Sequence, residues 1–148
     1  MGVLKWIGGW LAATIVLAVL ATALQSAFVI GMLEEIGAEI SAGPAVSMIA
    51  YDLAGLGPLY GAILGIGLLV AFLAGSALNR FTGLRTIVFA GAGAVCVAVA
   101  LFLMEQVFFG VQMIAGARTV TGFLAQVIAG GAAGLLFAAL TPPPRRAG

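Results

Sequence analysis

Few side chains of this sequence could do chemistry, and four of them are predicted to gather at one end of the molecule. Asp52 and Glu105 supply carboxylates, Arg118 supplies a guanidinium group and Gln106 supplies an amide. Such groups could bind a cationic or polar ligand, because each offers a charge or a hydrogen-bonding atom. Arg118 could instead pair with Glu105 or Asp52 and only close the end of a helical bundle. We call these four residues the outer polar rim, and the sequence leaves both interpretations open.

Gln126 is the strongly polar side chain that lies deepest in an apolar stretch, eight residues after Arg118. It belongs to a series with a small residue at nearly every fourth position, and a second series of glycines occurs earlier in the chain. Small residues at this spacing give a helix a face that another helix can approach closely. Gln126 is then expected to bond a neighbouring helix or, in an oligomer, to line a pore. The two predicted packing or partner faces contain Gly57, Gly61 and Gly65, and Gly122, Gln126, Gly130 and Gly134.

The sequence lacks the residues that several kinds of chemistry require. The sequence has no histidine, which excludes imidazole ligation of haem or copper, a Ser–His nucleophile and a zinc site of the usual type. Cys96 is the only cysteine, so one chain holds neither a disulfide nor a thiolate cluster. Glu34, Glu35 and Glu39 could offer oxygen ligands to Ca²⁺, but their spacing resembles no calcium loop and favours a solvated acidic face. We expect no catalytic residue, no enzyme activity, no metal, no cofactor and no nucleic-acid partner.

The elements that must position these residues are membrane helices. Of the 148 residues, 64% are hydrophobic and 7% are charged, against about 25% charged in a typical soluble domain. Four continuous apolar runs reach the roughly 20 residues that a helix needs to cross a bilayer, and they do not alternate as strands of a β-barrel would. The sequence predicts an all-α membrane protein, a four-helix bundle forming one domain over 1–140, with helices at 7–31, 58–78, 86–109 and 119–140.

The ends of the chain carry two further expectations. The first apolar run is longer than the 7–15 residues of a signal-peptide core, so we expect it to remain as a helix. Residues 141–148 contain three prolines and two arginines and are predicted to form an extended tail, because proline cannot continue a helix.

Charged residues separate between the two sides of the predicted up-and-down path. Lys5, Arg80, Arg85 and the two arginines of the tail fall on one side, and all five acidic residues with Arg118 fall on the other. Basic residues mark the cytoplasmic side of a membrane protein, so we expect both termini in the cytoplasm and a multi-pass protein of the inner (cytoplasmic) membrane. Glu105 lies twenty residues after Arg85, or about 30 Å along a helix, which places the outer polar rim at the outer interface.

Two connections differ in length. The short link at 79–85 predicts that the second and third helices are antiparallel neighbours. The segment 32–57 is longer, and its apolar residues repeat at helical spacing on both sides of Gly43 and Pro44. It is therefore predicted to form short amphipathic helices in the first outer loop.

Three classes of function remain. The first is a noncatalytic accessory or assembly subunit that packs its glycine and alanine faces against another membrane protein, which fits the small size and the lack of reactive groups. The second is a small oligomeric transporter or channel with an acidic outer vestibule, because negative charge at a mouth concentrates cations. The third is a sensor of the membrane surface. The lipid bilayer is a partner in each, together with another membrane protein or with a second copy of the chain.

Overall fold

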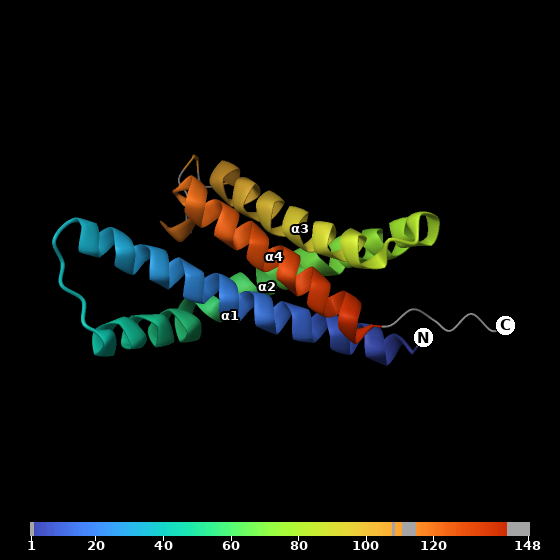
Figure 1. Cartoon of the computed structure of the whole chain (residues 1–148), viewed down its shortest axis with the longest axis horizontal. Coiled ribbons are helices and arrows are strands. Elements are labelled where there is room, and N and C mark those ends of the chain that lie inside the picture. The colour runs from blue at the N-terminus through green and yellow to red at the C-terminus, as the bar shows by residue number, and fades with distance from the viewer. Residues whose placement is uncertain (1, 108, 111–114, 142–148) are drawn as a thin grey trace.

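The computed structural model describes residues 2–107, 109–110 and 115–141. Four long helices account for most of them: α1 (Val3–Glu35), α2 (Ala42–Thr82), α3 (Arg85–Val107) and α4 (Val120–Leu140). A short 3₁₀ helix, η1 (Ala115–Ala117), precedes α4 (Figure 1). Each long helix is apolar enough and long enough to cross a bilayer. The prediction of an all-α bundle of four such helices is confirmed, and the chain is consistent with a small, multi-pass integral membrane protein. The predicted tail falls on 142–148, outside the described residues.

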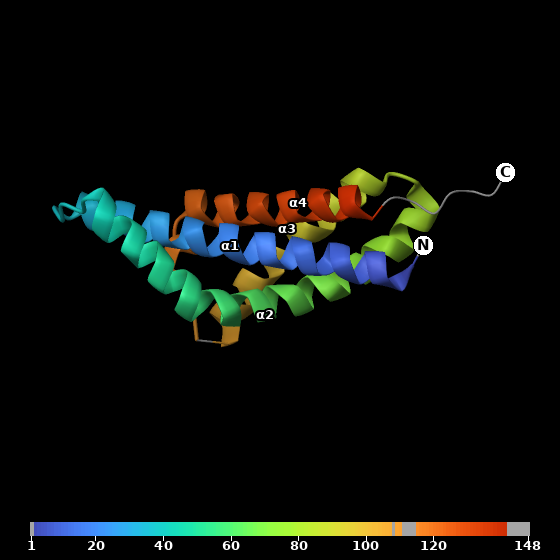
Figure 2. The same cartoon turned by 90° about the horizontal axis from the view of Figure 1, so that it is seen from below.

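The four helices form an antiparallel bundle in which each packs mainly on two others. α1 packs on α2 and α4, and α3 packs on α2 and α4, as the two views show (Figures 1 and 2). The link between α2 and α3 is only Gly83 and Leu84, and α2 ends there with Gly83 at φ +68°. Glycine adopts this left-handed conformation without a steric penalty. The antiparallel pairing expected from the short link is therefore confirmed.

Apolar side chains cover the outside of the bundle as well as its core. Leu17, Leu64, Phe72 and Phe137 are fully buried inside, whereas the lipid-facing positions of all four helices leave large aliphatic side chains exposed. In water such continuous apolar surface would drive association. In a bilayer the acyl chains cover it. Examples of these exposed residues are Ile15, Ile66, Val95 and Ile128.

The segment 32–57 does not form separate short helices, which corrects that prediction. α1 continues to Glu35, and α2 begins at Ala42 and runs without a break through Pro58. Pro44 lies in the first turn of α2. Backbone N–H groups in a first turn have no intrahelical acceptor, so the missing N–H of proline costs no hydrogen bond there. Pro58 bends α2 without ending it, and Figure 2 shows the bend where the helix changes from teal to green.

The chain reverses direction at Gly37. Its φ is +91°, and its N–H donates to the Glu34 carbonyl while the Ala38 N–H donates to the Leu33 carbonyl, both at 3.0 Å. These two bonds satisfy the last carbonyls of α1 in the arrangement of a Schellman motif. Because α1 has 33 residues and α2 has 41, or roughly 50 and 60 Å of helix, their hairpin projects beyond α3 and α4 (Figure 1).

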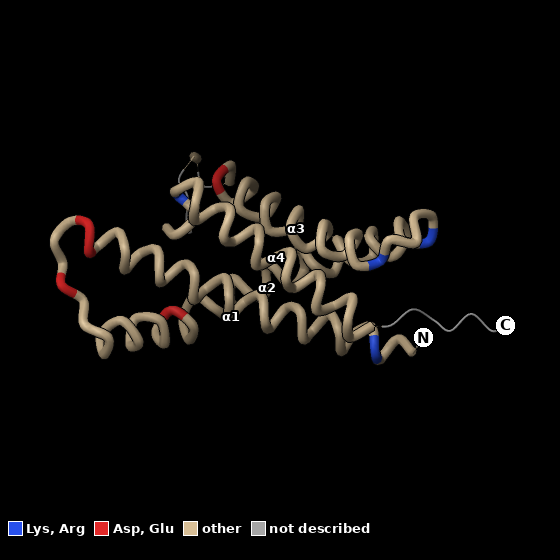
Figure 3. The backbone as a smooth tube through the Cα atoms, viewed as in Figure 1, with Lys and Arg blue, Asp and Glu red and all other residues tan. Residues whose placement is uncertain are grey.

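Charge divides the bundle into two ends (Figure 3). The basic end, where α1 begins and α4 finishes, carries Lys5, Arg80 and Arg85. The acidic end, where α1 turns into α2 and α3 connects to α4, carries Glu34, Glu35, Glu39, Asp52 and Glu105, together with Arg118.

Candidate functional site

The outer polar rim is spread over α2, α3 and the start of α4. Asp52 is partly buried, and its Oδ2 accepts a hydrogen bond of 2.7 Å from Ser26 Oγ on α1. Glu105 is partly buried in the last turns of α3, Gln106 is exposed beside it, and Arg118 is exposed between η1 and α4. Ser26 is a partner that the sequence analysis missed, because its spacing to Asp52 depends on how α1 and α2 pair.

Gln25 of α1 holds η1, the short helix that precedes α4. Its Oε1 accepts a 2.8 Å hydrogen bond from the Gly116 N–H of η1. A Cβ at Gly116 would lie 2.8 Å from Gln25 Cα, and a Cβ at Gly122 would overlap with the Gly116 carbonyl oxygen. Thr119 Oγ1 caps α4 by accepting from the Gly122 N–H at 3.0 Å. Gly122 is thus part of a close turn at the acidic end of α4.

Gln126 joins two helices in the interior. It is fully buried, and its Nε2 donates a 2.8 Å hydrogen bond to the Ala21 carbonyl of α1. In hydrocarbon an amide needs such a partner. Its other atom, Oε1, is buried and has no hydrogen-bond partner among the described residues.

The glycines of α2 face α1. A Cβ at Gly61 would lie 2.9 Å from Ala18 Cβ, and one at Gly65 would lie 2.8 Å from Thr14 Cγ2. Gly57 is looser: the nearest atoms to its Cβ position are Thr22 Oγ1 at 3.8 Å and the Asp52 carbonyl oxygen at 3.9 Å. The α1–α2 contact is therefore tight in its inner part and opens toward the acidic end.

The glycines of α4 face the backbone of α3. A Cβ at Gly130 would overlap with the Gly93 carbonyl oxygen, and one at Gly134 would overlap with that of Phe89. Two backbones approach this closely only when side chains are absent. Neighbouring helices of the same chain thus occupy the predicted glycine faces, which leaves these glycines buried and out of a partner's reach.

A second set of small residues, which includes Gly91 and Gly131, faces the lipid. It lines a groove of about 590 Å³ along the outer side of α3 and α4. Nothing lies within 4 Å of a Cβ at Gly91, and a Cβ at Gly131 would make only ordinary contacts, 3.7 Å to the Ala90 carbonyl oxygen and 3.9 Å to Ala94 Cβ. The groove is lined by Thr86, Ile87, Ala90, Gly91, Ala94, Val127, Ile128, Gly131, Ala132 and Leu135.

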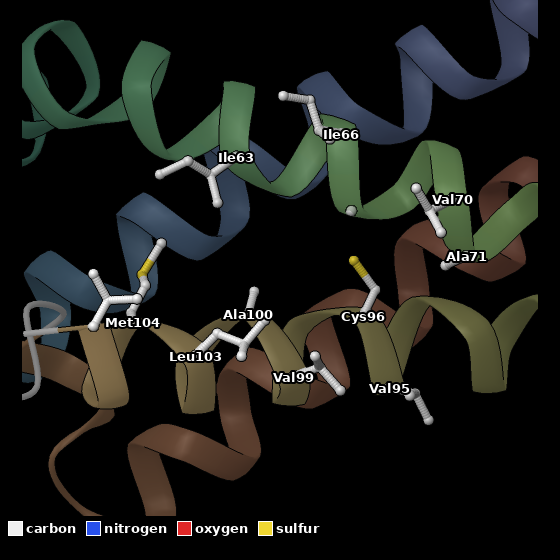
Figure 4. Close-up of a pocket in the computed structure, with 12 residues that line it drawn as sticks. Ile63, Ile66, Val70, Ala71, Val95, Cys96, Val99, Ala100, Leu103 and Met104 are labelled. Carbon is white, nitrogen blue, oxygen red and sulfur yellow. The ribbon is translucent and has the colours of Figure 1, made fainter. Parts of the chain in front are cut away.

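A second groove, of about 600 Å³, lies between α2 and α3 (Figure 4). Its walls are mainly branched and long aliphatic side chains, among them Ile63, Ile66, Val99 and Leu103. The Cys96 thiol points across it toward α2, where a Cβ at Gly67 would lie 2.8 Å from the sulfur. Cys96 therefore acts as a small apolar side chain that fills the contact with Gly67.

At the basic end, Arg85 of α3 binds the C-terminus of α4, a role that the sequence did not indicate. Its Nη2 donates to the carbonyl oxygen and the hydroxyl of Thr141, and its Nε donates to the Ala138 carbonyl at 3.4 Å. These are unpaired carbonyls at the C-terminus of α4, where a cation is favoured. The guanidinium also lies 5.0 Å from the centre of the Phe89 ring.

Aromatic rings fill the core beside Arg85. Phe137 stacks on Phe72 with ring centres 4.1 Å apart, and it meets Phe89 and Trp6 edge-on at 4.8 and 5.5 Å. Trp10 Nε1 donates a 2.9 Å hydrogen bond to the Gly65 carbonyl. The basic half of the bundle is thus closed by large packed side chains.

No group of three or more His, Cys, Asp or Glu residues that could hold a metal ion occurs in the described part of the chain. No protein-family model, curated protein or solved structure matches the chain.

Proposed function

We propose that this chain is a noncatalytic assembly subunit of a membrane complex, and that it receives a transmembrane helix of another membrane protein in the groove between α3 and α4. The observation that carries the proposal is the pair of lipid-facing glycines in that groove, Gly91 and Gly131.

Neither glycine is needed by the bundle. Both lie inside helices without a left-handed φ, and both have room for a side chain. Glycine in a helix interior costs roughly 0.5–1 kcal/mol relative to alanine, so the bundle would be more stable with alanine at either position. Small residues on a lipid-facing surface let a partner backbone come close, which is how helices associate in a bilayer.

The shape of the groove favours a different polypeptide over a second copy. A two-fold pairing of identical chains places the same surface on both sides, which here would set one groove against another. A single helix fills a groove better, because its side-chain ridge enters the space between α3 and α4.

The charge distribution supports an orientation and a location. Lys5, Arg80 and Arg85 lie at the basic end, and the excess of acidic residues lies at the other. By the positive-inside rule both termini face the cytoplasm and the protein lies in the inner (cytoplasmic) membrane. The lack of histidine supports a noncatalytic role.

A small oligomeric transporter is the second candidate, favoured by the acidic residues on the projecting α1–α2 hairpin, which would form an acidic vestibule. Such a path would have to run between subunits, because packed aromatic rings fill the basic half of each bundle.

Native mass spectrometry tests the proposal on the protein extracted from its own membrane at natural expression. We expect a stoichiometric complex with a different membrane protein, lost in Gly131→Leu and in Gly91→Leu. Ala74→Leu, at an exposed position of α2, is the matched control and should keep the complex. A lone monomer would overturn the proposal, and a discrete homo-oligomer would favour the transporter.

A further inference from the structure

A groove of about 460 Å³ lies at the acidic end, where α1 passes the start of α4. Glu35, the last residue of α1, borders it on one side, and Thr119 and Thr121 border it from the start of α4. The rest of its wall consists of small or apolar residues of α1: Ala27, Phe28, Gly31 and Met32. This groove combines a carboxylate, two hydroxyl groups and an apolar wall, whereas the two grooves on the sides of the bundle contain no charged residue.

Contacts between α1 and α4 fix the level of this groove along the bundle. Gln126 of α4 bonds the Ala21 carbonyl of α1, and Gln25 of α1 bonds the Gly116 N–H just before α4. Because the two helices run in opposite directions, the part of α1 beyond Gln25 projects past the start of α4 (Figure 1).

The start of α4 marks the edge of the hydrocarbon layer. α4 has 21 residues, or about 30 Å of helix, which equals the thickness of that layer. The headgroup region adds roughly 5–7 Å on each side. The projecting end of α1, and the groove beside it, therefore lie at the level of the lipid headgroups.

Gly31 keeps the groove open. It lies inside α1, one turn before Glu35, and its φ is not left-handed. A Cβ at this position would meet nothing within 4 Å. The fold does not require glycine here, and glycine in a helix interior is less stable than alanine. The missing side chain leaves space for a ligand between the apolar wall and the carboxylate.

We propose that this groove binds one bilayer phospholipid whose headgroup carries a primary amine, as in phosphatidylethanolamine. The ammonium group donates to the Glu35 carboxylate, and the phosphate accepts from the hydroxyls of Thr119 and Thr121. Thr119 can donate while it caps α4, because its oxygen accepts from the Gly122 N–H and its hydrogen is still available.

The charges around the groove favour this headgroup over an anionic one. Glu34, Glu35 and Glu39 lie together where α1 turns into α2, and the sequence has no basic residue between Lys5 and Arg80. A lipid with net negative charge is repelled there, whereas an ammonium group is attracted. On the opposite side of the groove, the N-terminus of α4 favours the phosphate. A zwitterionic amine lipid therefore places each of its charges beside a complementary group.

The apolar wall indicates a lipid and not a soluble amine. Phe28 and Met32 are half-buried, and they lie where the first carbons of an acyl chain follow the headgroup. A soluble phosphate ester of ethanolamine would leave this wall uncovered. The site does not depend on the docking of a partner helix between α3 and α4.

Native mass spectrometry of the purified, full-length protein tests the site by titration with single lipids that have the same acyl chains. We expect one phosphatidylethanolamine to bind about tenfold more tightly than phosphatidylglycerol, a factor that one charge-assisted hydrogen bond can supply. Phosphatidylcholine should also bind more weakly, because its trimethylated nitrogen has no N–H to donate. Equal affinity for phosphatidylethanolamine and either of these lipids would overturn the proposal.

Variants locate the binding on the groove. Gly31→Leu fills the groove and should abolish the preference for phosphatidylethanolamine, whereas Gly55→Leu, at an exposed position of α2, should keep it. Retention of the preference in Gly31→Leu would mean that the lipid binds elsewhere and that the proposal is wrong.

A matched pair of glutamates separates this site from general attraction to the acidic end. Glu35→Gln should lose most of the preference, and Glu34→Gln, which removes the same charge from the neighbouring residue, should keep most of it. Thr121→Val should weaken phosphatidylethanolamine binding by less than Glu35→Gln does. Equal effects of Glu34→Gln and Glu35→Gln would contradict a specific site. Soluble phosphoethanolamine should not displace the lipid, and displacement would show that the ligand is not a lipid.

Discussion

The two halves of the bundle are built from different parts. Toward the basic end, α4 is held by Arg85 at its last carbonyls, and Phe72, Phe89 and Phe137 fill the space between the helices. Toward the acidic end, amide side chains join neighbouring elements: Gln25 accepts from the Gly116 N–H, and Gln126 donates to the Ala21 carbonyl. The basic half is therefore closed by packed aromatic rings and by the Arg85 guanidinium, whereas the acidic half is joined by hydrogen bonds of neutral side chains. We therefore expect substitutions in the basic half to cost more stability than substitutions in the acidic half.

The largest effect is expected where α3 and α4 touch through their backbones. Gly134→Leu would drive a side chain into the Phe89 carbonyl, and backbone cannot move aside as a side chain can. Overpacking costs about 1–3 kcal/mol or more, so this variant should fail to give a monodisperse, folded protein in size-exclusion chromatography. Gly55→Leu, at an exposed position of α2 where an added Cβ meets nothing within 4 Å, should elute and unfold as the unchanged protein does. Equal behaviour of the two variants would contradict the close α3–α4 contact.

The second largest effect is expected at Arg85, which bonds the last carbonyls of α4 at the basic end. Arg85→Ala removes the hydrogen bonds to Ala138 and Thr141 and the contact with the Phe89 ring. Hydrogen bonds of charged groups contribute about 1.5–3 kcal/mol, and a loss in this range is expected in denaturant unfolding followed by tryptophan fluorescence. Arg80→Ala, at an exposed position, should change little. If Arg85→Ala and Arg80→Ala lose the same amount, Arg85 does not hold α4.

A smaller loss is expected in the acidic half at Gln126. Gln126→Leu removes the bond to the Ala21 carbonyl, and interhelical side-chain bonds in membranes contribute about 0.6–2 kcal/mol. The same unfolding measurement should show a loss below that of Arg85→Ala. A gain in stability would mean that the amide costs more through its unpartnered oxygen than it contributes through its bond.

The smallest effect concerns the start of α4. Thr119→Ala removes the cap on the Gly122 N–H, which should cost about 0.5–1 kcal/mol in the same measurement, at the low end of the range for helix caps. Thr119→Asp should restore most of the loss, because a carboxylate also accepts this bond and is favoured at a helix N-terminus. Failure of Thr119→Asp to recover stability would show that the side chain matters for another reason.

Sequence reasoning located the four helices to within a few residues at most ends. Apolar runs of this length have one solution in a bilayer, because every backbone polar group must bond within its own segment. The exception is the first hairpin, where the runs 7–31 and 58–78 extend to Glu35 and back to Ala42. Gly43 and Pro44 suggested a break there, but proline in a first turn costs a helix no bond.

The sequence by itself determined that the chain forms helices suited to a lipid bilayer. It also determined the separation of charge and the helix faces of small residues that allow close approach. Only the tertiary structure decided which helices meet there. A glycine face indicates that another helix comes close. Which helix that is depends on how helices that lie far apart in the sequence pack together. Gly61 meets Ala18, Gly134 meets Phe89, and Arg85 binds Thr141, 56 residues later. The loose contact at Gly57, with the Thr22 hydroxyl beside it, also follows from that packing, because local spacing carries no information about the distance between two helices.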